Sequence, residues 1–398
     1  MIQAAPQSLS SPQTTSPTRS PGDPDGRPTV CHVIHALGVG GAEMLVDVMV
    51  RQLHTDYRCV VAVLDEVGVL GEQLRADGFV VEHLHRQPGI DRGCARRLDA
   101  FARSHNVDLL HAHQYTPFFQ AMLSRGLMGR RPVLLTEHGR HVPDLPSRKR
   151  SLVNRLLLRK QDRLIGCGGA VRQALIDNEG LPAQRVDVIY NGVDLDAFAA
   201  AGHDARNRIR REFGWNDDHF VMVQVARLHE LKDHQTALQA IAQLRRTVPQ
   251  ARLLIVGEGD TRPEIEATIR QQQLGDHVRL AGSRGDVADL LAAADAFLMS
   301  SISEGIPLTI IEAMAAELPV VSTAVGGIPE MITHGQNGFL APARDFNQLS
   351  RSLVDLAGSP QLCARIGAAG RQTAERQFSL PGMLSSYRRL YQEMIHAD

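Results

Sequence analysis

The sequence has few cysteines and no long apolar run, and each shortage excludes a class of protein. The five cysteines are far apart in a chain of 398 residues and include no C-x-x-C pair: Cys31, Cys59, Cys94, Cys167 and Cys363. Neither a disulfide framework nor a zinc ribbon is therefore expected, and a reducing compartment, the cytoplasm, is favoured. No segment approaches the roughly 18 to 20 consecutive apolar residues of a membrane-spanning helix.

An excess of charge of one sign is also missing. The chain has 43 basic and 44 acidic residues, a formal net charge of -1, and an aromatic fraction of only 4%. It therefore lacks both the basic surface and the stacking side chains typical of nucleic-acid-binding proteins, and no nucleic acid is expected as a partner. Residues 1–27 contain five prolines and no apolar stretch, which predicts a disordered tail rather than a signal peptide.

From Thr29 onward, short apolar runs alternate with segments of helical periodicity. This pattern predicts β-α-β units around two buried parallel sheets, an α/β fold of two doubly wound, Rossmann-like domains. We expect the domains at 28–195 and 219–379, joined by a linker at 196–218. The apolar runs are 30–34, 59–64, 79–84, 108–111, 133–136 and 163–166, then 220–225, 252–256, 278–281, 296–299, 320–322 and 338–340.

The segment 303–315, with the sequence SEGIPLTIIEAMA, closely follows the apolar run 296–299. Pro307 suits the first turn of a helix, because its missing N–H would be unpaired there in any case. Gly305 and Ile306 are therefore expected at a strand-to-helix turn. Free backbone N–H groups at such a helix start attract anions, above all phosphates.

Two glutamates belong to the same segment. Glu304 precedes the turn and Glu312 lies further along the helix. A carboxylate accepts hydrogen bonds from neighbouring hydroxyls, so Glu312 could bind a ribose and Glu304 a hexose. Both could also be ordinary acids at a helix start and on a helix surface.

A pair of cations follows the first apolar run of the second domain. Arg227 and Lys232 could converge above the sheet and neutralise a diphosphate leaving group. The alternative is that both are solvated surface cations. Gly257 and Gly259 form a flexible turn after the next run, but this G-x-G does not extend to G-x-G-x-x-G.

The first domain contributes a glycine-rich turn and several histidines at the ends of its apolar runs. The turn at 38–43, GVGGAE, follows the first run and could approach a phosphate or sugar closely. A histidine at a strand end can donate to a sugar hydroxyl. We interpret His111 as structural and His138, beside Gly139, as functional. No acid or cysteine has the spacing for a zinc site with these histidines.

These motifs together resemble glycosyltransferase family 4, and they occur in the order found in that family. The resemblance covers the chain from about Thr29 to its end, and it implies the GT-B fold and a retaining, nucleotide-sugar-dependent reaction. In the GT-B fold the last helix usually crosses back to the first domain, so 380–398 is expected to pack there. The motifs are 40–43, 191–194, Arg227 with Lys232, the pair Glu304 and Glu312, and 326–330.

The resemblance also implies roles for individual residues. Arg227 and Lys232 would hold the donor diphosphate, Glu304 the transferred hexose and Glu312 the ribose. His138 would lie near the transferred sugar, and Arg227, Lys232, Glu304 and His138 form the expected catalytic set. The other expected donor-binding residues are Gly40 and Gly41 of the first domain, Gly257 and Gly259 at the base, and Gly305, Ile306, Pro307 and Leu308 at the helix start.

The sequence departs from the family pattern at four positions. Ala226 stands where a glycine commonly precedes the arginine, and Asp233 where a glycine often follows the lysine. Gly168 and Gly169 replace a serine and a helix former, which could loosen the start of the following helix. None of these changes removes an expected catalytic group.

The function expected from this resemblance is transfer of a hexosyl unit from a nucleotide diphosphate sugar to a saccharide or lipid-linked acceptor. Neither a cofactor nor a metal is expected, and a UDP-sugar is preferred over a GDP-sugar as donor. Two rivals stay open: a GT-B epimerase acting on a sugar nucleotide, and a non-catalytic sugar-nucleotide-binding subunit.

A basic segment suggests a further partner. Between Arg125 and Arg163 there are 11 basic and three acidic residues. In helical projection Arg148, Arg155 and Arg159 share a stripe with Arg163, beside an apolar face. Such a helix could lie on an anionic membrane surface, placing the enzyme peripherally at the cytoplasmic face, or could use its apolar face to cover the sheet.

Overall fold

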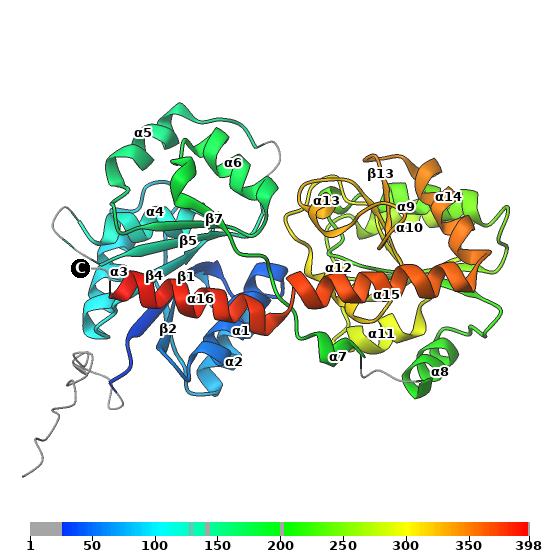
Figure 1. Ribbon diagram of the computed structural model, residues 1–398, viewed down its shortest axis with the longest axis horizontal. Helices are drawn as coiled ribbons and strands as arrows, with labels where there is room; N and C mark the ends of the chain where they lie inside the picture. The colour runs from blue at the N-terminus through cyan, green and yellow to red at the C-terminus, as the bar shows by residue number, and fades with distance from the viewer. Residues whose placement is uncertain (1–25, 127–128, 130, 140–143, 200–202, 397–398) are drawn as a thin grey trace, which may run out of the picture.

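Two parallel sheets divide the protein into two domains that lie side by side (Figure 1). The computed structural model describes residues 26–126, 129, 131–139, 144–199 and 203–396, so most of the expected tail at 1–27 lies outside the described residues. The first sheet has the strand order β3-β2-β1-β4-β5-β6-β7, and the second the order β10-β9-β8-β11-β12-β13. In both, the order reverses beside the first strand, which is the arrangement of a doubly wound fold.

The first domain alternates strands and helices in the way that the apolar runs predict. Its strands are β1 (Thr29–Ala36), β2 (Arg58–Glu66), β3 (Val80–His83), β4 (Leu109–His113), β5 (Val133–Glu137), β6 (Arg163–Gly166) and β7 (Val186–Val188). Its helices are α1 (Gly41–Leu53), α2 (Gly68–Ala76), α3 (Arg92–Ser104), α4 (Tyr115–Ser124), α5 (Arg148–Leu157) and α6 (Gly169–Glu179).

The second domain repeats this alternation. Its strands are β8 (Phe220–Val225), β9 (Ala251–Val256), β10 (Val278–Gly282), β11 (Ala296–Met299), β12 (Val320–Thr323) and β13 (Phe339–Ala341). The helices from 195 onward are α7 (Leu195–Ala199), α8 (His203–Glu212), α9 (His234–Leu244), α10 (Arg262–Gln271), α11 (Val287–Ala293), α12 (Leu308–Ala315), α13 (Ile328–Met331), α14 (Phe346–Ala357), α15 (Pro360–Gln377) and α16 (Leu380–Ile395).

The predicted fold class is confirmed, and each of the twelve apolar runs forms a strand. The sequence analysis missed β7, which pairs in parallel with β6 at the edge of the first sheet. This strand has only three residues, and its central Asp187 is exposed. An edge strand with one open face has no continuous apolar run, so the pattern used for the other strands does not find it.

The segment 196–218 was expected to be a linker, but it contains most of α7 and all of α8, which pack against the second domain. Ile209 and Trp215 are buried in the same apolar cluster as Phe297 of β11. Arg210 pairs with Asp295 at 2.8 Å and is only 2% exposed. The many charged residues of this segment suggested a solvated connection, whereas a few of them anchor it to the domain.

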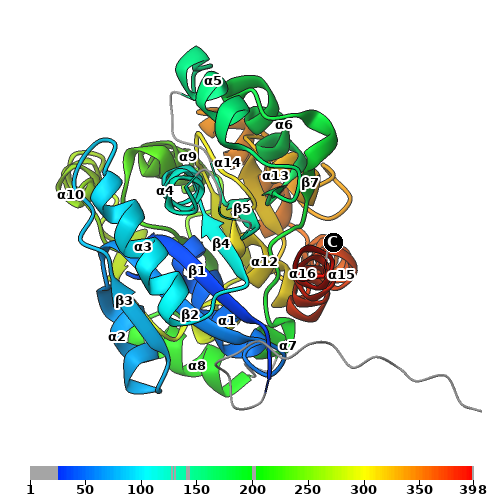
Figure 2. The same cartoon turned by 90° about the vertical axis from the view of Figure 1, so that its left-hand side faces the viewer.

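Helix α16 returns to the first domain, and α15 and α16 follow one another along one side of both domains (Figures 1 and 2). Tyr387 and Tyr391 of α16 are almost completely buried in the apolar cluster that includes Leu45 and Val46 of α1. The Tyr391 hydroxyl lies 2.6 Å from Nδ1 of His111 on β4. Among the described residues, no helix is long and apolar enough to cross a membrane.

Candidate functional site

The loop between β11 and α12 holds a compact polar cluster at the carboxyl edge of the second sheet. Lys232 Nζ lies 2.6 Å from Oε1 of Glu304. Ser301 Oγ donates to the same carboxylate oxygen at 2.6 Å. Because the Glu304 side chain is only 8% exposed, these two contacts compensate for much of its lost hydration. The structure thus brings together Lys232 and Glu304, which the sequence analysis proposed separately.

Glycines of the second domain let the loop pack closely against backbone of both domains. Gly326 has φ +55°, and a Cβ there would collide with the backbone oxygen of Glu304. Gly327 donates its N–H to the Gly305 oxygen at 3.1 Å. On the other side, a Cβ on Gly305 would collide with the His138 oxygen of the first domain. The Glu304–Gly305 backbone is therefore packed between the 326–327 turn and the end of β5.

Arg227 occupies a different setting from Lys232. Its side chain is exposed, and among the residues that the structure describes it forms no ion pair. Gly257 and Gly259 shape its turn, because a Cβ at either would collide with the backbone oxygens of Ala226 and Leu228. The structure therefore supports the turn that carries Arg227 but leaves its guanidinium free to meet a ligand.

Asp233, one of the departures from the family pattern, fits a conformation usually reserved for glycine. Its φ is +43°, in the left-handed region that aspartate tolerates better than most residues. Its carboxylate accepts from Thr236 N at 3.3 Å and from Thr236 Oγ1 at 2.6 Å. The aspartate thus caps α9 and keeps the turn after Lys232 that a glycine would also allow.

The Glu312 side chain is partly exposed, while most other residues of its helix, α12, are buried in the core. Burial raises the pKa of its carboxyl group to about 7. Desolvation disfavours the charged form, and hydrogen bonds donated by a ligand would restore it. A carboxyl group in this setting is suited to accept hydrogen bonds from two neighbouring hydroxyls.

Gly40, Gly41 and Pro307 lie near the same contact between the domains. Gly40 is the N-cap of α1, and Pro307 the N-cap of α12. A Cβ on Gly41 would lie 4.0 Å from Cδ1 of Leu308, so the start of α1 faces the start of α12. Asn191 Nδ2 donates to the Ile306 oxygen at 3.0 Å. The two helix starts are thereby held close together across the domain boundary.

A carboxylate from the second domain caps a helix of the first. Glu330 accepts from the backbone N–H groups of Gly169 at 2.6 Å and Ala170 at 2.8 Å. Tyr190 donates to the same carboxylate at 3.0 Å. Gly168 and Gly169 leave room for Glu330, because a Cβ on either would lie 3.3 or 3.2 Å from its carboxylate oxygens. The glycine pair therefore does not loosen this helix start but opens it to a cap from the other domain.

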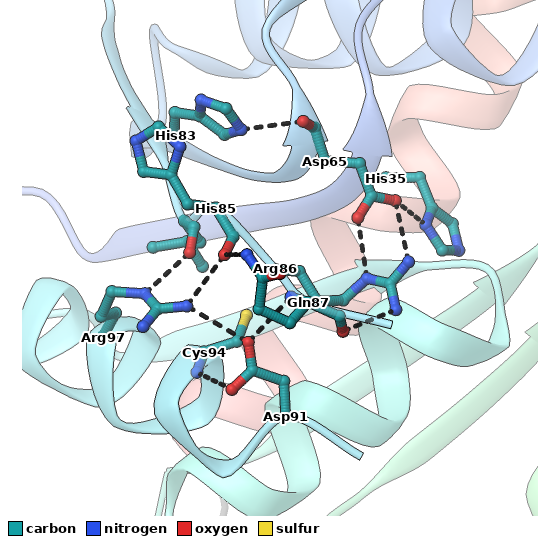
Figure 3. A network of polar contacts seen from close by, with 10 residues as sticks. His35, Asp65, His83, His85, Arg86, Gln87, Asp91, Cys94 and Arg97 are labelled. Atoms are coloured by element: carbon teal, nitrogen blue, oxygen red, sulfur yellow. Dashed lines mark hydrogen bonds and ion pairs between the residues drawn. The ribbon is translucent and has the colours of Figure 1, made fainter. Parts of the chain in front are cut away.

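A second polar network lies at the carboxyl ends of β1, β2 and β3 (Figure 3). Asp65 accepts from Arg86 at 2.8 and 3.2 Å and lies 2.8 Å from Nδ1 of His35. The Arg86 and His35 hydrogen bonds outweigh partial burial and lower the pKa of Asp65. Nε2 of His83 lies 2.8 Å from the Asp65 backbone oxygen. Ligands of open α/β sheets bind beyond these strand ends, so this network belongs to the ligand-facing edge of the first domain.

The sequence analysis named none of the residues of this network, nor Asn191 as a contact to Ile306, nor Glu330 as a cap. The signal for His35, Asp65 and His83 was present, since each lies at the end of an apolar run. The sequence analysis considered only His111 and His138 as strand-end histidines that could bind a sugar. The roles of Asn191 and Glu330 depend on contacts between the domains, which no local pattern encodes.

Helix α5 carries the basic segment, but the predicted stripe is too long. The helix ends at Leu157, so Arg159 and Arg163 are not part of it. Buried Asp162, which pairs with Arg125 at 2.6 Å, accepts from the Arg159 N–H at 2.7 Å and stabilises the turn that follows. Among the described residues from 144 to 160, the exposed side chains are Leu145, Pro146, Arg148, Lys149, Leu152, Arg155, Leu156 and Lys160.

Comparison with known proteins agrees with this architecture. The model of "Glycosyltransferase Family 4" matches residues 39–197, and that of "Glycosyl transferases group 1" matches residues 205–373. The putative glycosyltransferase EpsD of Bacillus subtilis is 30% identical over 290 residues, 71% of this chain and 75% of that protein. The N-acetyl-alpha-D-glucosaminyl L-malate synthase of Bacillus anthracis is 28% identical over 316 residues, 78% of this chain and 81% of that protein.

Solved structures share the fold. HepE of Anabaena, crystallised in complex with UDP, superposes with a TM-score of 0.82 at 22% identity, over 92% of this chain and 100% of that one. A glycosyltransferase of Rickettsia africae gives a TM-score of 0.82 at 19% identity, over 93% and 100% of the two chains.

Two Rossmann-like domains with the polar cluster between them define a glycosyltransferase of the GT-B fold. The chain belongs to glycosyltransferase family 4, and its relatives include glycosyltransferases named for the biosynthesis of amylovoran and, putatively, of colanic acid. The predicted family, fold and enzyme class are thereby confirmed.

Proposed function

We propose that this protein is a retaining glycosyltransferase that moves a hexosyl unit from a nucleotide diphosphate sugar, without a metal or other cofactor, to a saccharide or lipid-linked acceptor. The observation that carries the proposal is the Lys232–Glu304 pair at 2.6 Å, placed before the start of α12. At this place the structure brings together a cation that could stabilise a departing phosphate, a carboxylate that could bind sugar hydroxyls, and the N–H groups of a helix start.

The geometry supports the following roles in the reaction. Lys232, together with Arg227 on the adjacent turn, would stabilise the negative charge that develops on the leaving diphosphate. Glu304 would accept hydrogen bonds from the transferred hexose, and Glu312 from the ribose. The acceptor hydroxyl would attack from the same face as the departing diphosphate, which preserves the anomeric configuration and uses no protein nucleophile.

The remaining donor contacts would come from backbone on both sides of the cleft. The backbone N–H groups of Gly305 and Ile306 precede the N-cap of α12, and that of Leu308 begins the helix. Pro307, the N-cap, has no N–H. Gly257 and Gly259 would approach the base, while Gly40, Gly41 and His138 would contact the donor from the first domain. A UDP-sugar is the proposed donor, which is supported by the complexes of HepE with UDP and with UDP-glucose.

A thermal-shift panel tests the donor. UDP-glucose, UDP-N-acetylglucosamine, GDP-mannose and ADP-glucose are added separately, and a ligand at 100 times its dissociation constant stabilises the fold by about 2.7 kcal/mol. We expect a UDP-sugar to give the largest shift. Because the pKa of Glu312 is about 7 and ribose hydroxyls bind its ionised form, affinity should rise as the pH increases through 7.

The Glu312→Gln variant is the control for this pH dependence, since an amide does not ionise in this range. It should bind the donor more weakly and with the same affinity at pH 6 and pH 8. No shift with any nucleotide sugar would contradict the proposed donor class. An altered sugar nucleotide formed without acceptor would instead identify the epimerase, and binding without release of UDP a non-catalytic subunit.

We also propose that the acceptor is presented at an anionic membrane surface to which α5 docks. Exposed leucines and arginines alternate on this helix, with Leu152 60% and Leu156 74% exposed, and among its residues only Asn154 is buried. Leu157, the last residue of the helix, packs against the core cluster of the first sheet, whereas Leu152 and Leu156 remain exposed. Leucines buried at the headgroup boundary, with cations attracted to anionic lipid, form a typical interfacial helix. Helix α5 lies at the outer edge of the first domain (Figures 1 and 2).

Sedimentation with liposomes tests this surface. The triple variant Arg148→Glu, Lys149→Glu and Arg155→Glu should lose binding to phosphatidylglycerol vesicles, since each cation near the surface contributes on the order of 1 kcal/mol. Leu152→Ser with Leu156→Ser should weaken binding at constant charge. As a matched control, the exposed Arg270, Arg351 and Arg365 of the second domain are changed to glutamate, with binding retained. Equal binding by the α5 variants and this control would contradict the proposal.

A further inference from the structure

Two adjacent serines follow β11, and each contacts one partner of the Lys232–Glu304 pair. Ser300 Oγ lies 2.8 Å from the Asp233 backbone oxygen and 3.1 Å from that of Lys232. Ser301 Oγ instead donates to Oε1 of Glu304 at 2.6 Å. The two serines thus link the turn that carries Lys232 to the loop that carries Glu304.

The position of Ser301 is fixed by its backbone contacts and by its burial. Its backbone oxygen accepts from Oγ1 of Thr323, the last residue of β12, at 2.5 Å. The next residue, Ile302, donates its N–H to the Leu231 oxygen at 2.9 Å. Neither Ser301 nor Thr323 has exposed surface. The Ser301 hydroxyl is therefore held on a rigid support and is not itself accessible to a ligand.

The contacts of Glu304 distinguish its two carboxylate oxygens. Lys232 Nζ and Ser301 Oγ both lie 2.6 Å from Oε1. Each carboxylate oxygen offers two lone pairs, so these two donors occupy Oε1. None of the residues that the structure describes donates to Oε2. Of the two oxygens, Oε2 is therefore the one that can accept from a further group.

Lys232 alone would not fix the carboxylate in this orientation. Its ammonium group is a compact charge on a flexible stem, and it would be attracted to either oxygen. The terminal torsion of a glutamate side chain is broad, so a carboxylate that is held by a cation alone can rotate. The Ser301 side chain is short and buried, and its hydroxyl reaches Oε1 only.

We propose that Ser301 is a positioning residue that holds Oε1 of Glu304 together with Lys232, fixes the plane of the carboxylate and leaves Oε2 for a hydroxyl of the transferred sugar. The carboxylate then meets the sugar in an orientation that is already set before binding, which lowers the cost of ordering it in the complex. The contact with the sugar rests on the proposed function, whereas the fixed orientation of the carboxylate does not.

Crystal structures of variants test the orientation of the carboxylate without any ligand. In Ser301→Ala, the Glu304 carboxylate should rotate out of its wild-type plane or occupy two orientations. Ser301→Cys should show the same change while keeping the packing, because a thiol of similar shape is only a weak donor. A single, unchanged orientation of Glu304 in both variants would overturn the proposal.

Ser303→Ala is the matched control for these structures. Ser303 belongs to the same loop, is partly exposed, and its hydroxyl forms no hydrogen bond with a residue that the structure describes. This variant should leave the Glu304 carboxylate as it is in the wild type. The same displacement in Ser303→Ala as in Ser301→Ala would also overturn the proposal.

Calorimetric binding of UDP and of UDP-glucose measures the consequence for the site. Ser301→Ala should weaken UDP-glucose by about 10-fold and UDP by less than about 2-fold, because a hydrogen bond to a charged group is lost and only the hexose meets Glu304. A merely structural role of Ser301 would weaken both ligands equally, and this result would overturn the proposal.

A double variant shows whether Ser301 acts through Glu304. In Glu304→Ala the Ser301 hydroxyl has already lost its acceptor, so the further change Ser301→Ala should alter the affinity for UDP-glucose by less than about 2-fold. The full loss of the single variant on top of that of Glu304→Ala would overturn the proposal. If the wild type binds neither UDP nor UDP-glucose while the carboxylate moves in the Ser301 variants, only the proposed function fails.

Discussion

Replacement of Lys232 by alanine is expected to slow sugar transfer by about 10²- to 10³-fold, equivalent to about 2.7 to 4 kcal/mol in the barrier. The ammonium group would stabilise charge on the departing diphosphate, and it also pairs with Glu304 at 2.6 Å. The variant loses both interactions, because Glu304 is left buried with Ser301 as its remaining partner. Steady-state release of UDP in the presence of acceptor measures the effect.

Two further variants separate these contributions. Lys232→Met keeps most of the side-chain volume and should be as slow as Lys232→Ala, which shows that charge rather than packing matters. Arg270→Ala removes an exposed cation of the second domain and should leave the rate unchanged. Full activity in Lys232→Ala would contradict the proposed mechanism.

Replacement of Gly326 by alanine is expected to destabilise the second domain and displace the loop that carries Glu304. The left-handed conformation, with φ +55°, costs a residue with a Cβ about 1 to 2 kcal/mol. The Cβ would also collide with the Glu304 oxygen, and such overpacking typically costs about 1 to 3 kcal/mol more. Urea denaturation measures the free energy of unfolding, and the donor thermal shift reports on the loop.

Gly335→Ala is the matched control for this variant. Gly335 has φ +75° in the same domain, but a Cβ there would meet no atom within 4 Å. It should therefore show the conformational cost alone and bind the donor like the wild type. If both variants are equally stable and bind equally well, the 326–327 turn does not support the loop as proposed.

The sequence predicted the sheets well because both are built from buried parallel strands. Strands such as β6 and β8 are nearly continuous apolar runs bounded by polar residues, and their predicted bounds match the structure. The predicted basic stripe on α5, by contrast, was too long. Helical projection assumes that the helix continues, whereas the chain turns after Leu157 because buried Asp162 binds Arg125 and the Arg159 N–H.

The candidate site was predictable only where its residues are close in sequence or carry a family motif. Lys232, Glu304 and Glu312 were proposed in this way. The contacts of Asn191 with Ile306 and of Glu330 with Gly169 join residues 115 and 161 positions apart, so the motifs that contain Asn191 and Glu330 do not reveal their partners. Asp233 shows the opposite case, in which a departure from the family pattern keeps the backbone conformation that the pattern encodes.

The return of α16 has a consequence for how the protein is made. Six side chains of this helix complete the apolar cluster on one face of the first domain: Met383, Leu384, Tyr387, Leu390, Tyr391 and Met394. During translation that face stays uncovered until almost the whole chain has left the ribosome. The domain synthesised first is therefore the last to be completed, and a ribosome that stops within the second domain releases a chain with an exposed, aggregation-prone surface.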